Sequence, residues 1–159
     1  MSNDLNELFD EAINMELNAA RLYELFRDIL PDDSLFWGQL AVEEKNHTAL
    51  LQDGRERFYP MGKFPIEVFP SSITSLLWAN RGVVFLIDKY RERPPSREEA
   101  FNTALSLEQA AGEAHFQQFM EKGPATKVEE IFKELNRNDR DHAKRIRSYM
   151  EEHHIKIEK

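Results

Sequence analysis

Two pairs of residues, each an acid followed three positions later by a histidine, combine types and spacing that suit metal chemistry. They are Glu44 with His47 and Asp139 with His142. On a helix, side chains three residues apart lie on the same face. Each pair can therefore direct a carboxylate oxygen and an imidazole nitrogen at one metal ion.

Two other predicted helices each carry a single carboxylate in the middle of an apolar row, Glu16 within 4–29 and Glu108 within 97–121. An ionised carboxylate buried without a partner costs several kcal/mol or more, and four that converge also repel one another. Two divalent cations would neutralise four carboxylates, and two neutral imidazoles would complete the ligand set. The sequence thus predicts a two-metal site inside a four-helix bundle, with the ligands Glu16, Glu44, His47, Glu108, Asp139 and His142.

The alternative is that these acids pair with basic side chains or face solvent. Arg21, Lys45 and Arg140 are near in sequence but fall off the inward rows. A third pair with the same spacing, Glu151 and His154, lies near the polar C-terminal end, and we attribute it to chance.

The two halves of the chain resemble each other around the lone acids. Tyr23 follows Glu16 by seven residues, and His115 follows Glu108 at the same offset. Tyr23 is either a core residue or a hydrogen-bond donor to a ligating carboxylate. For His115 we favour a buried, hydrogen-bonded role over direct metal ligation.

Helical periodicity predicts four main helices, at 4–29, 34–53, 97–121 and 127–151. Five prolines between 55 and 95 exclude one continuous helix there. We expect this segment to hold one or two short helices and to lie along the bundle as a long crossover, so that the second and third main helices run parallel. Its aromatic residues either cover the core or line a subunit interface, and we treat Trp37 and Trp78 as packing residues.

Composition narrows the class of protein. A chain of 159 residues predicts one domain, 1–159. The net charge of −8 argues against nucleic acid and anionic membrane surfaces as partners. The absence of cysteine excludes disulfides, iron–sulfur clusters and a rubredoxin-type centre within these residues. The polar N-terminal stretch is no signal peptide and no apolar run could span a bilayer, so we expect a soluble cytoplasmic protein.

These motifs resemble the ferritin-like superfamily, and within it the rubrerythrin-type diiron domain. The stretch 40–51, LAVEEKNHTALL, is similar to that family's second-helix signature, and 104–108, ALSLE, resembles the entry to its third helix. The resemblance implies an all-α, ferritin-like four-helix bundle with a long crossover. It assigns Glu16, Glu44 and His47 to one iron. It assigns Glu108, Asp139 and His142 to the other. Two departures are Asp139, where the family has Glu, and Ala111, where rubrerythrins carry an extra Glu.

By this resemblance, the expected function is that of a non-haem diiron oxidoreductase that reacts with hydrogen peroxide or O₂. Its cofactor would be two Fe ions, with Mn or Zn as possible substitutes. Electrons would come from a separate, rubredoxin-like donor protein, and the chain would form a homodimer or small homo-oligomer. Two alternatives are an iron-storage protein with ferroxidase activity and a bundle that binds Zn or Mn structurally without turnover.

Overall fold

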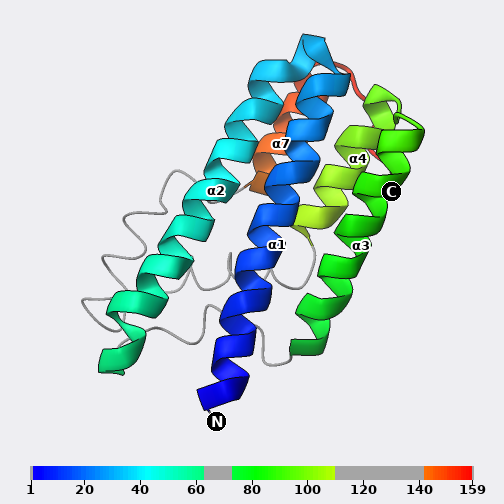
Figure 1. The fold of residues 1–159 in the computed structure, drawn as a ribbon. Helices are drawn as coiled ribbons and strands as arrows, with labels where there is room; N and C mark the ends of the chain where they lie inside the picture. Colours follow the sequence, from blue (N-terminus) through cyan, green and yellow to red (C-terminus); the bar gives the residue numbers. More distant parts are fainter. Residues whose placement is uncertain (1, 63–72, 110–141, 159) are drawn as a thin grey trace.

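The computed structural model describes residues 2–62, 73–109 and 142–158, and every regular element within these ranges is helical (Figure 1). The α-helices are α1 (Ser2–Ile29), α2 (Ser34–Arg57), α3 (Ile73–Glu92), α4 (Arg97–Glu108) and α7 (His142–Glu152), and two 3₁₀ turns span Pro31–Asp33 and Tyr59–Met61. In these ranges no helix has both the length and the apolar character needed to cross a membrane.

The helices pack with alternating directions. α1, α3 and α7 run one way and α2 and α4 run the other, so α2 and α4 are parallel, as the crossover predicts (Figure 1). α1 packs along both α2 and α3, and α4 packs on α7. The carboxylates predicted to point inward thus lie on elements that surround a shared interior.

The main core is built around the buried ring of Trp37 on α2. This ring contacts Tyr23 and Phe26 of α1, Phe101 of α4, and its own neighbour Phe36. The apolar rows predicted for 4–29 and 97–121 supply three of these partners, because a helical spacing of three to four residues keeps a row on one face. The aromatic cluster fixes how α1, α2 and α4 are rotated, and therefore where their acids point.

Asp33, in the turn between α1 and α2, ties two later helices to the first pair. Its buried carboxylate accepts hydrogen bonds from Arg97 Nε at 2.8 Å and Arg97 Nη2 at 2.7 Å, and from the Tyr149 hydroxyl at 2.7 Å. Arg97 begins α4 and Tyr149 lies near the end of α7. One carboxylate therefore fixes the same end of three segments that are distant in sequence.

The crossover differs from the expectation in one respect. A single helix of 20 residues, α3, forms between Pro70 and Pro94 in place of one or two short ones. Its buried row, Leu76, Val83, Ile87 and Tyr90, packs inward, and the buried Asn80 side chain donates to Glu11 O at 3.0 Å and to Glu11 Oε2 at 2.8 Å. The Trp78 side chain is 67% exposed, so of the two roles expected for the aromatic residues of the crossover it does not have the one in the core.

The predicted end of the second helix was also wrong. α2 continues past Gly54 to Arg57, and the Phe58 N–H still donates to Gly54 O at 3.0 Å. The left-handed residue that ends the following turn is Gly62, with φ of 68°. At the start of α4, Ser96 Oγ accepts a hydrogen bond from the Glu99 N–H at 3.1 Å and caps the helix. Residues 110–121 of the third predicted helix and 127–141 of the fourth lie outside the described residues.

Candidate metal centre

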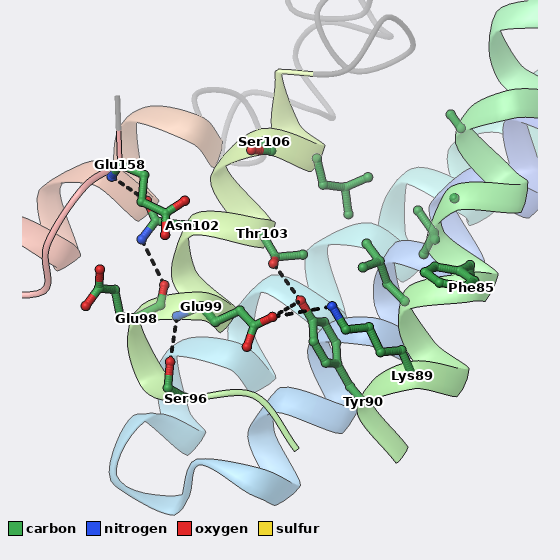
Figure 2. A pocket seen from close by; sticks show the side chains of 15 residues that line it. Phe85, Lys89, Tyr90, Ser96, Glu98, Glu99, Asn102, Thr103, Ser106 and Glu158 are labelled. Carbon is green, nitrogen blue, oxygen red and sulfur yellow. Dashed lines mark hydrogen bonds and ion pairs between the residues drawn. The ribbon is translucent and has the colours of Figure 1, made fainter. Parts of the chain in front are cut away.

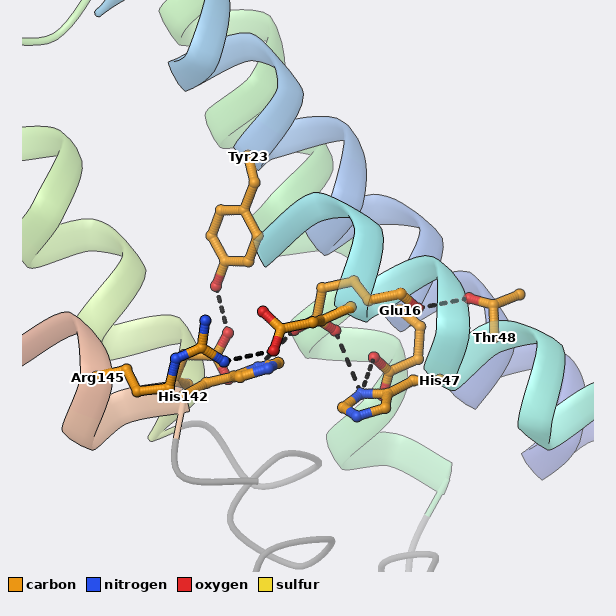
Figure 3. A network of polar contacts seen from close by, with 9 residues as sticks. Glu16, Tyr23, His47, Thr48, His142 and Arg145 are labelled. Carbon is orange, nitrogen blue, oxygen red and sulfur yellow. Dashed lines mark hydrogen bonds and ion pairs between the residues drawn. The ribbon is translucent and has the colours of Figure 1, made fainter. Parts of the chain in front are cut away.

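Five of the six predicted ligands are described, and all five are buried within one cluster (Figure 3). Glu16 comes from the middle of α1, Glu44 and His47 from α2, Glu108 from the end of α4 and His142 from the start of α7. Asp139, the sixth, lies outside the described residues, and so does His115.

The five residues form two groups that share Glu44. In the first, Glu16, Glu44 and His47 each offer a ligand atom within 4.8 Å of the others, and in the second Glu44, Glu108 and His142 do the same. His47 Nδ1 lies 3.3 Å from Glu16 Oε2 and 3.7 Å from Glu44 Oε2. His142 Nδ1 lies 2.9 Å from Glu44 Oε1 and 3.5 Å from Glu108 Oε2. The two oxygens of Glu44 therefore face different histidines, which is the geometry of a carboxylate that can bridge two ions.

The two imidazole rings also face each other. The ring centroids of His47 and His142 are 5.5 Å apart and the planes are inclined by 23°. The two rings, each with carboxylates around it, belong to two neighbouring groups that could each hold a metal ion.

Tyr23 is joined to the second group. Its hydroxyl donates a hydrogen bond to Glu108 Oε1 (Figure 3), while its ring stacks on Trp37 with centroids 5.7 Å apart. The second role considered for Tyr23, donation to an acid of the cluster, is therefore present in the structure. The hydrogen bond holds Glu108 in one orientation and leaves its Oε2 directed at His142.

Burial and the charges of neighbouring residues shift the pKa values of the cluster. Burial, followed by repulsion from the Glu44 carboxylate, raises the pKa of Glu16 to about 8. Burial alone would lower the pKa of both histidines, but the carboxylates around them prevail and raise it well above the usual value. Burial would likewise raise the pKa of Glu44, yet its hydrogen bond with Glu16 and the charge of His142 hold it well below the usual value. The raised pKa of each histidine favours a positive charge on its ring, at the positions where cations are predicted.

The orphaned atoms of the cluster fit a metal. Among the described residues, no well-aligned hydrogen bond reaches either oxygen of Glu44, Oε2 of Glu108 or either ring nitrogen of His142, and their close polar neighbours are the acids and histidines of the cluster itself. Each buried polar atom left unpaired costs about 1–3 kcal/mol. Carboxylate oxygens and imidazole nitrogens are ligands for divalent Fe, Mn and Zn. These residues could hold a metal ion and would be stabilised by one.

A neighbouring ion pair was not predicted as part of the site. Glu43, beside Glu44 in sequence, is buried and pairs with Arg145, one turn after His142 on α7 (Figure 3). The structure gives the two acids different partners: Glu44 lies among the histidines, whereas Glu43 joins α2 to α7.

The basic residues considered as partners for the acids lie elsewhere. Lys45 pairs with Glu24, and Arg21 donates to Asn18 Oδ1 at 3.1 Å. Arg140 lies outside the described residues. The third acid–histidine match is exposed at both Glu151 and His154, consistent with chance.

A separate cavity of about 950 Å³ lies between α3 and α4 (Figure 2). Val83 and Leu86 line its apolar wall, and Thr103 lies on its polar wall, where the Tyr90 hydroxyl is 2.9 Å from Thr103 Oγ1. It contains none of the acids or histidines of the cluster, so it is distinct from the candidate metal centre.

Comparisons of the chain with protein-family models, with curated proteins and with solved structures give no match. The function must therefore be inferred from the residues of the site.

Proposed function

We propose that this chain is a non-haem dinuclear carboxylate protein, built as a ferritin-like four-helix bundle. Within that class we propose a rubrerythrin-type diiron oxidoreductase that reduces hydrogen peroxide or O₂. The observation that supports the proposal is the pair of buried acid–histidine groups that share Glu44. Two cations on either side of one carboxylate would account for this arrangement, whereas a single ion would occupy only one of the two groups.

The ligand chemistry favours iron or manganese. Three carboxylates and two imidazoles form a set rich in oxygen and contain no thiolate, which suits hard cations more than soft ones. Bound Fe(II) would supply Lewis acidity and the electrons that reduce the oxidant. Hydrogen peroxide takes up two electrons and two protons and leaves as two molecules of water.

The protein's own residues would position ligands and handle protons. Tyr23 keeps an O–H group at the edge of the cluster, where it orients Glu108 and is a proton donor within reach of the interior. Met15, Ala19 and Trp37 are buried in the same apolar core as Tyr23 and would limit access of water to its hydroxyl. Because the chain has no cysteine, we propose that electrons arrive from a separate, rubredoxin-like protein.

The test is reaction of the iron-loaded protein with peroxide. Protein purified without oxygen and loaded with Fe(II) should bind two Fe per chain, and peroxide should oxidise this iron faster than free Fe(II) at the same concentration. Glu7→Ala, an exposed acid on the same helix as Glu16, is the matched control and should behave as wild type. An oxidation rate equal to that of free Fe(II) would contradict the oxidoreductase proposal. Uptake of many irons per chain by a very large particle would instead indicate storage.

A further inference from the structure

The outer face of α3 carries large apolar side chains in contact with solvent. Leu77, Trp78, Val84 and Phe85 are 37%, 67%, 46% and 66% exposed. Their spacing of one, six and one residues places them on one side of the helix, opposite the row buried against the rest of the molecule. We call these four side chains, with Arg81 and Asp88 among them, the α3 face.

This face has a composition unlike that of an ordinary solvated helix. A contiguous apolar patch of several hundred Å² on a monomer commonly marks an interaction site. Two of its four apolar residues are aromatic, and Arg81 lies over the Trp78 ring with its guanidinium 5.8 Å from the centroid. Aromatic residues and arginine are enriched in protein interfaces. None of the described ligands of the metal cluster lies on α3, so a partner bound here would leave that cluster accessible.

The charges on the face are complementary to those of a second, antiparallel copy. A twofold axis that passes between residues 84 and 85 places each residue opposite one at the same distance on the other side of the axis. Arg81, three and a half residues before the axis, then faces Asp88, three and a half residues after it, and the pair forms twice. Val84 and Phe85 of one copy lie beside Phe85 and Val84 of the other at the axis, so an apolar centre is flanked by opposite charges.

A hollow on the same helix suits the remaining aromatic residue. It has a volume of about 500 Å³ and is lined by Phe85, Asp88, Lys89, Glu92 and Arg93. In the antiparallel arrangement Trp78 of the second copy lies level with residue 91 and on the same side as Lys89 and Glu92. The indole therefore reaches this hollow, where Phe85 offers an apolar wall and Glu92 a hydrogen-bond acceptor.

We propose that two copies of this chain dimerise through their α3 faces, antiparallel about a twofold axis between residues 84 and 85. The dimer buries Phe85 and Trp78 and pairs Arg81 of each copy with Asp88 of the other. This interface does not depend on the metal centre.

Light scattering and sedimentation over a wide range of protein concentration test the dimer. Wild type should be dimeric, and Phe85→Glu should weaken dimerisation by about a hundredfold or more, because it places two like charges at the centre of the interface. Leu35→Glu is the matched control: Leu35 is a 91% exposed apolar residue at the start of α2, and its replacement should leave the dimer intact. Circular dichroism establishes that each variant remains helical.

Charge exchange tests the register of the two helices. Arg81→Asp and Asp88→Arg should each weaken dimerisation on their own, since each faces like charges. An equimolar mixture of the two variants should restore dimers, because both cross-pairs then join opposite charges, and the double variant should also dimerise. The proposal would be overturned if wild type is monomeric or if the Phe85→Glu variant still dimerises as wild type does. It would also be overturned if the mixture of the two charge variants dimerises no more than each variant alone.

Discussion

Glu44 is the residue on which the candidate centre depends most. It is fully buried, its two oxygens face different histidines, and it belongs to both ligand groups. Each of the other described acids belongs to one group. Loss of Glu44 should therefore affect both metal positions, whereas loss of a terminal acid should affect one.

This asymmetry predicts a graded series of metal contents. Glu44→Ala should lower the metal bound per chain from two to well below one, whereas Glu16→Ala and Glu108→Ala should each retain about one, because metal affinity requires a complete set of deprotonated ligands. Elemental analysis after equilibrium dialysis measures the content, and Glu7→Ala should match wild type. Equal losses in all three site variants would argue against a shared carboxylate.

Removal of the Tyr23 hydroxyl tests its link to Glu108. Tyr23→Phe keeps the ring that stacks on Trp37 and deletes one buried hydrogen bond. It should lower the unfolding free energy of the metal-free protein by about 1–2 kcal/mol and slow peroxide reduction by about tenfold or more. Denaturant titration with a chelator and stopped-flow absorbance measure the two effects. Tyr59→Phe is the control, and an equal loss of rate in that variant would remove Tyr23 from the mechanism.

At the residue scale, the sequence was sufficient to predict which acids converge in the candidate metal centre. A charged residue inside an apolar row can be recognised from the sequence alone. Glu16 and Glu108 were found in this way, and Glu44 was found by its spacing to His47. The partner of Glu43 was not predictable, because Arg145 is distant in sequence and meets it only once α7 has packed on α2. Which oxygens of Glu44 face which histidine depends on the same packing.

Among the elements, the turn before α2 is the part that holds the helix ends together. Asp33 accepts hydrogen bonds from Arg97 at the start of α4 and from Tyr149 on α7. Burial alone would raise the pKa of Asp33, but these hydrogen bonds and the Arg97 charge hold it below its usual value. Burial, followed by the hydrogen bond to Asp33, raises the pKa of Tyr149 to about 12, so its hydroxyl remains a donor through the neutral range.

The depressed pKa of Asp33 predicts loss of stability in acid. A carboxyl group whose pKa is lower in the folded state stabilises the fold above its unfolded pKa, about 3.9, and the contribution is lost as pH falls through the folded value. Asp33→Asn should lower the unfolding free energy at neutral pH by about 2 kcal/mol, and its difference from wild type should shrink below about pH 4. Denaturant titrations between acid and neutral pH measure the difference in unfolding free energy. Asp32→Asn, at the exposed neighbouring acid, is the control. A difference that does not depend on pH would contradict the assigned ion pair.

Element boundaries show where pattern analysis succeeds and fails. The N-cap at Ser96 was predictable because its hydrogen bond is local. The end of α2 was not, since Gly54 is compatible with a helix and packing carried the helix further. In α3 both faces contain apolar residues, so periodicity alone could not tell that Leu76 and Val83 face inward while Trp78 faces solvent.

At the scale of the whole molecule, the candidate metal centre and the outer α3 face lie on different helices. α1, α2, α4 and α7 supply the described ligands, while α3 packs on α1 and presents an apolar surface outward. A charge of −8 spread over the chain suits the attraction of cations. The cost of burying three acids and two histidines together is offset if metal ions occupy the interior, and so metal should stabilise the fold.

The most direct measurement is an anomalous diffraction map recorded at the iron edge from a crystal grown with Fe(II). The proposed centre predicts two iron peaks within the bundle, one beside His47 and one beside His142, with Glu44 between them. The central claim would be contradicted by a single peak or by a peak only at the protein surface. It would also be contradicted by a crystal without iron in which Glu16, Glu44 and Glu108 pair with other protein groups.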